Sequence, residues 1–180
     1  MERSVVIAGF GGQGVILAGK ILAQAAMDHG LHVTWLPSYG PEMRGGTANC
    51  TVVFSDETVG SPIVDEPSAL VAMNLPSLDK FEPILESGGT AVINSSLIER
   101  TVERSDLKTT YIAANDLATQ VGNPRTINMI ALAAYVRASG AVPLETVKAA
   151  MAKAMEKGGK QKLIAINEQA LDAGYNAAAA

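Results

Sequence analysis

The sequence is organised around one stretch near its N-terminus, Val5-Val6-Ile7-Ala8-Gly9-Phe10-Gly11-Gly12-Gln13-Gly14-Val15. An apolar run rich in β-branched residues leads into four glycines, and an apolar-periodic segment follows over residues 15–27. This order predicts a strand, a tight turn and a helix. Gly9, Gly11 and Gly14 fit G-x-G-x-x-G, a pattern in which glycines allow a sharp turn, a close approach by a ligand or another backbone, and tight packing of helix on strand.

The glycine turn has two open interpretations. In one, the unpaired N–H groups at the start of the helix bind a phosphate. In the other, the glycines only make a compact turn, packed within the chain or against another subunit. Binding of a nicotinamide dinucleotide is less favoured, because the second expected strand, residues 32–36, ends in Pro37-Ser38-Tyr39 and not in the acidic residue that would hold a ribose.

Length and composition restrict the class of protein. The 180 residues predict a single domain spanning 1–180. Only 18% of the residues are charged, which is low and suggests that other chains cover part of the surface. The net charge of −4 gives no electrostatic case for nucleic acid. No apolar run reaches the roughly 18 residues of a membrane span, and no signal peptide precedes the first strand, so we expect a cytoplasmic protein.

A second glycine-rich stretch, Ser38-Tyr39-Gly40-Pro41-Glu42-Met43-Arg44-Gly45-Gly46, has no helix or strand period. Chain direction places it beyond the C-terminal end of the second strand, beside the glycine turn, at the edge where open parallel sheets bind ligands. The planar guanidinium of Arg44 suits a phosphate or a carboxylate. The alternatives are an Arg44–Glu42 ion pair or a salt bridge to a partner chain.

The rest of the chain alternates strands with helices and becomes helical after about residue 123. It predicts an α/β, Rossmann-like fold: a mainly parallel sheet with helices on both faces and a helical C-terminal third. We further expect a short returning strand at residues 59–63, which would form a hairpin, and Asn115-Asp116 as the cap of a helix. The expected strands cover residues 47–55, 68–74, 90–94 and 109–114, and the expected helices 75–86, 123–139, 143–156 and 162–172.

Residue types for catalysis are missing from the pattern. No carboxylates are paired for acid–base work, and neither His29 nor His32 has a nucleophile or a metal partner at a recognisable spacing. The single cysteine, Cys50, excludes an internal disulfide and any four-cysteine iron–sulfur or zinc site made by this chain alone. We therefore expect Cys50 to be buried, and we expect no catalytic residue and no metal ligand.

Taken together, the two glycine-rich stretches and Gly60-Ser61-Pro62 resemble the gamma subunit of 2-oxoacid:ferredoxin oxidoreductases. The 2-oxoglutarate type is nearest, and the pyruvate, ketoisovalerate and indolepyruvate members are similar. Asn123 and Asn128-Met129 fit as well, so the resemblance spans about residues 5–132.

The resemblance implies a complex that converts a 2-oxoacid, coenzyme A and oxidised ferredoxin into an acyl-coenzyme A, carbon dioxide and reduced ferredoxin. Thiamine diphosphate, Mg²⁺ and iron–sulfur clusters would belong to other subunits, and this chain alone would bind none of them. The implied partners are alpha and beta subunits, of which beta binds thiamine, a ferredoxin-like delta subunit in some members, and ferredoxin as electron acceptor.

The resemblance also implies roles for particular residues. Lys20 matches by spacing a lysine implicated in holding coenzyme A, and Arg44 is similar to a basic residue that precedes paired glycines. The expected coenzyme A or phosphate contacts are Gly11, Gly12, Gln13, Gly14, Lys20 and Arg44. The expected loop and subunit contacts are Ser38, Tyr39, Glu42, Gly45 and Gly46. The rival hypotheses are a free-standing Rossmann nucleotide-binding domain and a purely structural subunit.

Overall fold

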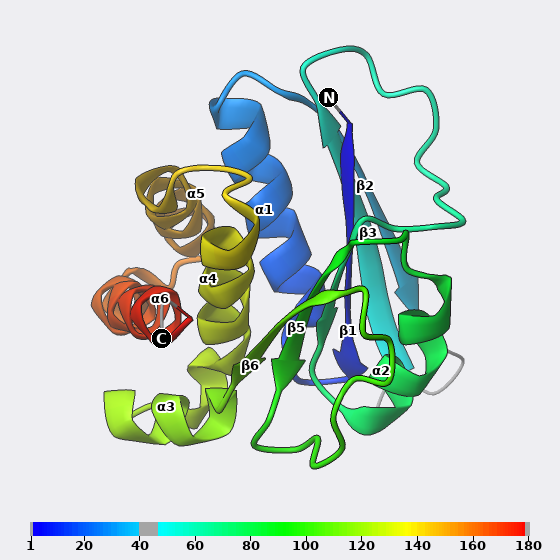
Figure 1. Cartoon of the computed structure of the whole chain (residues 1–180). Helices are drawn as coiled ribbons and strands as arrows, with labels where there is room; N and C mark the ends of the chain where they lie inside the picture. Colours follow the sequence, from blue (N-terminus) through cyan, green and yellow to red (C-terminus); the bar gives the residue numbers. More distant parts are fainter. Residues whose placement is uncertain (1, 40–46, 179–180) are drawn as a thin grey trace.

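The computed structural model describes residues 2–39 and 47–178, which form one sheet covered by helices (Figure 1). The strands are β1 (Arg3–Phe10), β2 (His32–Tyr39), β3 (Thr47–Ser55), β4 (Ala69–Ala72), β5 (Thr90–Asn94) and β6 (Lys108–Ile112). The α-helices are α1 (Val15–Asp28), α2 (Leu75–Phe81), α3 (Ala114–Val121), α4 (Ile127–Ser139), α5 (Leu144–Lys157) and α6 (Ile164–Ala177). Short 3₁₀ turns, η1 (Glu82–Ile84), η2 (Pro124–Thr126) and η3 (Gln161–Leu163), connect some of them.

The strand order is β2-β3-β1-β4-β5-β6. Strands β1, β4, β5 and β6 pair in parallel, whereas β3 pairs antiparallel with both of its neighbours. Five of the described strands therefore run in one direction and β3 runs against them. The expected mainly parallel α/β sheet is confirmed, with β3 as the exception.

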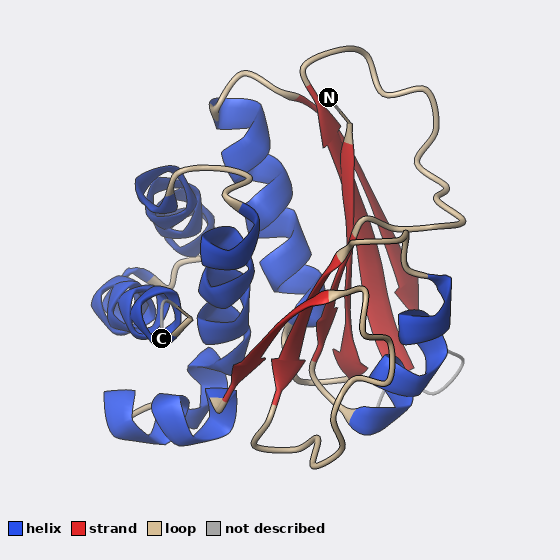
Figure 2. Cartoon of the chain, in the orientation of Figure 1, coloured by secondary structure: helices blue, strands red, loops and turns tan. Residues whose placement is uncertain are grey.

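Helices cover both faces of the sheet, as expected (Figure 2). Successive side chains of a strand point to opposite faces, so Val5 and Ile7 of β1 pack in the core beneath α1 and α4, while Val6 and Ala8 pack in a smaller core beneath α2. The larger core continues through α4 to α5 and α6, which form a second helical layer. The C-terminal third is helical, as predicted.

The hairpin was predicted at the wrong place. Residues 59–63 form no strand, and the hairpin is instead made by β2 and β3, which pair antiparallel. The prediction ended the second strand before Pro37, but β2 continues to Tyr39. Proline is tolerated there because β2 is an edge strand, where a missing backbone N–H interrupts no ladder on the outer side.

The start of α3 also differs from the prediction. Asn115 and Asp116 lie inside its first turn, and the N-cap is Ala113. The Asn115 carboxamide is used differently: its Oδ1 accepts a hydrogen bond from Asn94 Nδ2 (2.9 Å). A contact between the end of β5 and the first turn of α3 has replaced the local cap that the sequence suggested.

Candidate functional site

The glycine turn lies between β1 and α1 with the backbone that its glycines allow. Gly12 and Gly14 have φ of 98° and 75°, in the left-handed region that other residues avoid, and Gly14 is the N-cap of α1. A Cβ on Gly9 would lie 2.8 Å from the Met73 Cβ. The glycines thus provide the sharp turn and the close packing that the pattern predicted.

Gln13 closes this turn against the next strand. Its Oε1 accepts from the Phe10 backbone N–H (2.6 Å), and its Nε2 donates to the Met73 carbonyl (3.3 Å). Both amide ends are therefore used within the chain. This places Gln13 as a brace of the turn, although it was expected as a phosphate contact.

The turn lies at a topological switch point. From β1 the chain passes through α1 to β2 on one side, while β4 pairs on the other side of β1. Ligands of open α/β sheets bind in the crevice outside the carboxyl ends of the two strands at such a point. Here residues 11–14 follow β1 and Asn74 follows β4 at that edge of the sheet.

Carboxamide side chains follow the parallel strands along this edge, and the sequence analysis did not single them out as site residues. Asn74 caps α2 through Oδ1, which accepts from Ser77 N (2.9 Å), while its buried Nδ2 has no partner among the described residues. Asn94 donates to the Met73 carbonyl (3.4 Å) and accepts from Ala114 N (3.2 Å). The sequence signal that could have found them is that an asparagine stands at or just after the end of both β4 and β5. The Asn94 contacts link the end of β4, β5 and the start of α3 at this edge of the sheet.

The second glycine-rich stretch joins β2 to β3 at the same edge. Gly9 of β1 pairs with Ala48, which pairs with Tyr39, and Phe10 pairs with Thr47. Tyr39 at the end of β2 and Thr47 at the start of β3 therefore lie level with the end of β1, where the glycine turn begins. Ser38 is exposed at the end of β2, whereas Glu42, Arg44, Gly45 and Gly46 lie outside the described residues.

Lys20 lies away from the turn, along α1. It is exposed and lines a groove of about 430 Å³ between α1 and α5, together with Lys153 and Lys157. Leu17 and Ile21 of α1 line the same groove. Two lysines of α5 thus share a groove with Lys20, which the sequence did not indicate.

An ion pair connects the two helices of this α1–α5 groove. Lys153 Nζ donates to Asp28 Oδ2 (2.8 Å), and Gln24 Nε2 donates to Asp28 Oδ1 (2.8 Å). These hydrogen bonds, the one from Lys153 first, hold the pKa of Asp28 below its usual value. The cation of Lys153 is therefore partly neutralised, whereas no ion pair involves Lys20 or Lys157 among the described residues.

Cys50 is buried against α1, as predicted. Its Sγ donates to the Val15 carbonyl (3.4 Å), and burial raises the pKa of the thiol to about 11. A thiol that stays protonated at neutral pH is a poor nucleophile. Within the described part of the chain, no group of three or more His, Cys, Asp or Glu side chains is arranged to hold a metal ion.

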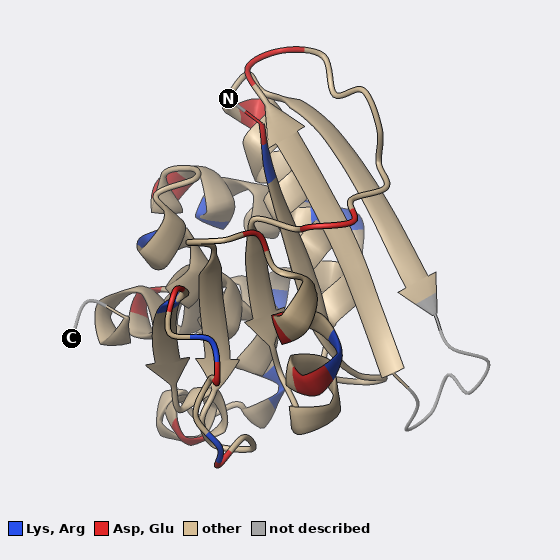
Figure 3. Ribbon diagram, turned by 45° about the vertical axis from the view of Figure 1, so that its right-hand side comes forward, with Lys and Arg blue, Asp and Glu red and all other residues tan. Residues whose placement is uncertain are grey.

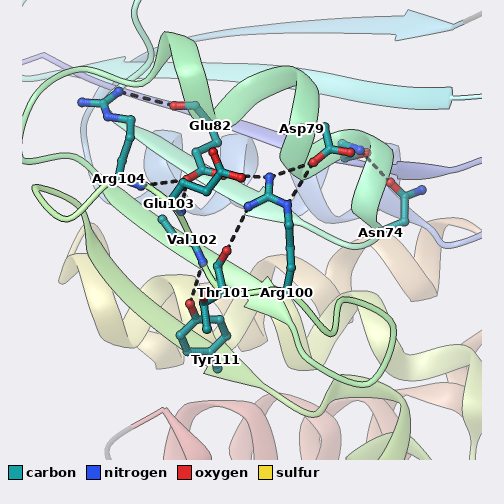
Figure 4. Close-up of polar contacts among 10 residues, drawn as sticks. Asn74, Asp79, Glu82, Arg100, Thr101, Val102, Glu103, Arg104 and Tyr111 are labelled. Atoms are coloured by element: carbon teal, nitrogen blue, oxygen red, sulfur yellow. Dashed lines mark hydrogen bonds and ion pairs between the residues drawn. The ribbon is translucent and has the colours of Figure 1, made fainter.

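A polar network fixes the segment after β5 against α2 (Figure 4). The buried carboxylate of Glu82 accepts from the backbone N–H groups of Glu103 (2.5 Å) and Arg104 (3.0 Å) and pairs with Arg100 (2.9 Å). Burial acts to raise the pKa of Glu82, but these hydrogen bonds and Arg100 outweigh it and leave that pKa lowered. The network holds residues 100–104 in place against α2 and η1.

The family model described as pyruvate ferredoxin/flavodoxin oxidoreductase matches residues 4–177. This chain belongs to that family. The resemblance found in the two glycine-rich stretches is thereby confirmed. In the described residues no helix has both the length and the apolar character needed to cross a bilayer.

Curated relatives agree with this assignment. Ketoisovalerate oxidoreductase subunit VorA of Methanothermobacter marburgensis is 42% identical over 173 residues, covering 96% of this chain but only 36% of VorA. This chain therefore spans about a third of that relative's length. The 2-oxoglutarate synthase subunit KorC of the same organism is 36% identical, over 91% of this chain and 92% of KorC.

A solved structure agrees over nearly the whole chain. The keto/oxoacid ferredoxin oxidoreductase gamma subunit of Geobacter sulfurreducens has a TM-score of 0.86 and 29% identity, covering 99% of this chain and 97% of that one. The chain described here therefore has the fold of a solved gamma subunit.

Proposed function

We propose that this chain is the gamma subunit of a multisubunit 2-oxoacid:ferredoxin oxidoreductase and is inactive alone. The reaction joins a 2-oxoacid to coenzyme A, releases carbon dioxide and passes two electrons to ferredoxin. The similarity to KorC, over 91% of this chain and 92% of KorC, supports a gamma-type role, and the similarity to VorA leaves both a 2-oxoglutarate and a ketoisovalerate type open. A chain with one cysteine cannot supply four thiolates to an iron–sulfur cluster, so alpha, beta and delta partners would carry the clusters, the thiamine diphosphate and its Mg²⁺.

The role that suits this chain is positional. It would cover the reacting centre of a sibling subunit, exclude water and hold the coenzyme A thiol for acyl transfer. Lys20, Arg44 and the N–H groups at the start of α1 would contact the phosphates, since ammonium, guanidinium and helix N-termini all favour them. The single observation that carries this proposal is the α1–α5 groove, in which Lys20 is grouped with Lys153 and Lys157.

The strand order argues against the rival dinucleotide-binding hypothesis. In that fold the acidic residue for the ribose stands at the carboxyl end of the strand beside β1. Here the neighbour of β1 on that side is β3, which runs antiparallel and brings its N-terminal residue, Thr47, to this edge. A nicotinamide dinucleotide therefore lacks its usual partner.

Substitution in the assembled complex tests the proposal. Lys20→Ala is expected to raise the KM for coenzyme A about tenfold with kcat unchanged at saturation, because a charge-assisted contact to phosphate is lost. Arg44→Ala is expected to act in the same direction. Lys108→Ala, at the opposite end of the sheet, is the control and should change neither constant.

Each alternative has its own outcome. An unchanged KM for coenzyme A in both variants would favour the purely structural subunit. Purification of the native protein as a stable single chain, without a thiamine- or cluster-containing partner, would contradict the subunit proposal itself.

A further inference from the structure

A second groove lies on the other side of Leu17 from the α1–α5 groove. It has a volume of about 450 Å³ and runs between the start of α1, η2, the end of α5 and the start of α6; we name it the η2–α6 groove. Its volume falls within the roughly 300–1,000 Å³ of small-molecule sites. It adjoins the glycine turn, because Asn128 lines it and donates from Nδ2 to the Gly14 carbonyl (3.1 Å).

Two buried asparagines line this groove and use only their amide N–H groups within the chain. Asn128 donates to Gly14, and Asn167 Nδ2 donates to the Leu163 carbonyl (2.7 Å); each residue is 6% exposed. The Oδ1 atoms accept no hydrogen bond from any described residue. Neither oxygen is fully buried, so both can be reached from outside the chain. Two fixed carbonyl oxygens are therefore left to accept a hydrogen bond from whatever enters the groove.

The other lining residues fit a flat ring joined to an anion. Leu17, Met155 and Leu163 contribute apolar surface, and methionine packs well against aromatic rings. Arg125 and Lys160 are exposed lining residues, and neither side chain has an ion pair among the described residues. The groove thus offers an apolar surface, acceptors for an amino group and two cations.

We propose that the η2–α6 groove binds an adenine nucleotide, with the exocyclic amino group of the ring donating to Asn128 or Asn167 and the phosphate beside Arg125 and Lys160. Guanine and hypoxanthine carry a carbonyl oxygen at that ring position, which would face the same acceptors without a donor. The nucleotide is either the adenosine phosphate end of coenzyme A or a free adenine nucleotide. Only the first source depends on the proposed function.

Titration of the full chain with AMP and IMP tests the base recognition. AMP is expected to bind saturably and IMP at least tenfold more weakly, because a site built for one hydrogen-bonding group rejects its replacement. Lys160→Ala should weaken AMP binding about fivefold, while Lys162→Ala, an exposed lysine outside the groove lining, should leave it unchanged. Equal binding of AMP and IMP, equal effects of the two lysine variants, or no saturable binding of AMP would each overturn the proposal.

The assembled complex distinguishes the two sources. If the nucleotide is part of coenzyme A, AMP competes with coenzyme A, and Lys160→Ala raises the KM for coenzyme A. If AMP binds the chain without competing, the groove is a separate adenine nucleotide site and the inference stands with that source. Failure of the chain to assemble with thiamine-containing partners would remove the proposed function and leave the AMP and IMP comparison intact.

Discussion

At the scale of single residues, Gly9 shows how a motif glycine can be required for packing alone. Its position has no positive φ, yet a Cβ there would lie 2.8 Å from the Met73 Cβ and 3.1 Å from Val15 Cγ1. Gly12 is the opposite case: a Cβ would meet nothing within 4 Å, but φ is 98°. The same sequence pattern therefore requires glycine for close packing at one position and for backbone conformation at another.

Gly9→Ala is expected to destabilise the chain by about 1–3 kcal/mol, because the added methyl overpacks the junction of β1, β4 and α1. Gly60→Ala is the matched control. Gly60 has no neighbour within 4 Å of its Cβ position and no positive φ, so alanine there should be neutral or slightly stabilising. Urea unfolding followed by circular dichroism measures both, and equal midpoints for the two variants would contradict the packing argument.

Residue-scale chemistry was predictable where it depends on residue type, and less so where it depends on neighbours. One buried cysteine and the missing ribose acid follow from the sequence alone. Gln13 was expected to face a ligand, but its two amide ends are taken by Phe10 and Met73. Met73 lies 60 positions away, so no local pattern could have revealed that contact.

At the scale of elements, α4 and α6 approach closely through one glycine. A Cβ on Gly174 would lie 2.8 Å from both the carbonyl carbon and the Cα of Ile130, and backbone atoms in a helix cannot move aside. Alanine is intrinsically better than glycine in a helix by about 1 kcal/mol. At Gly174 the steric clash of an added Cβ should outweigh this gain in helix propensity.

Gly174→Ala is accordingly expected to lower the free energy of unfolding by about 1–3 kcal/mol. Ala165→Gly, at an exposed position of the same helix, isolates the effect of helix propensity and should lower it by about 1 kcal/mol. Thermal or urea unfolding of both variants checks the prediction. A Gly174→Ala protein more stable than the parent would show that α6 can shift away from α4.

The Glu82 network makes a prediction about pH. The pKa of Glu82 is lowered in the folded chain, whereas it is about 4.3 in an unfolded one. Its contribution is therefore fully present above about pH 4.3 and is lost as the pH falls through the folded-state pKa. Glu82→Gln should be less stable than the parent by about 3 kcal/mol at pH 7, since Arg100 and two backbone N–H groups lose their charged acceptor.

The difference between the Glu82→Gln variant and its parent should shrink as the pH falls below about 4.3, because Glu82 then takes up a proton in the unfolded parent while it stays ionised in the folded one, until the lowered folded-state pKa is reached. Urea unfolding at several pH values from 7 to 3 measures this. Glu99→Gln, an exposed position in the same segment, should follow the parent at every pH. A difference that stays constant across the range would show that Glu82 contributes through shape and not through charge.

Element order was predictable from β-branched runs and glycine punctuation, and the sheet topology was not. The expected strand at 59–63 failed because its residues find no pairing partner, whereas β2 and β3 pair over eight positions. The sequence also did not show that β3, and not β2, pairs with β1. Both facts depend on contacts between segments, which the alternation of residues within one segment does not encode.

At the scale of the whole molecule, charge is distributed unevenly. Strands β2 and β3 contain no Asp, Glu, Lys or Arg, and Figure 3 shows this part of the sheet without charged residues while the helices and loops carry them. An uncharged edge strand is a surface that proteins normally protect or cover. The low fraction of charged residues in the sequence thus corresponds to one uncharged region of the sheet. Such a region suits a chain that works inside a complex.

The two cores of the molecule are unequal, and this predicts the order in which its parts open. The core beneath α1 and α4 extends to the second helical layer of α5 and α6, whereas the core beneath α2 contains only a few side chains from α2, the strands and the segments between them and is closed by the Glu82 network. Opening free energies within one protein range from near zero to the global value. We expect α2 and residues 95–107 to exchange their amide hydrogens through a local opening, and β1, β4 and α4 only through global unfolding.

Native-state hydrogen exchange read by mass spectrometry measures this order. Added urea should accelerate exchange in β1, β4 and α4 as steeply as it promotes global unfolding. Exchange in α2 should depend on the urea concentration only weakly. Glu82→Gln should speed exchange in α2 and residues 95–107 beyond its effect on α4, because the network closes only that side. Equal acceleration everywhere would mean that the two faces of the sheet unfold as one unit, and the smaller core would then have no separate opening.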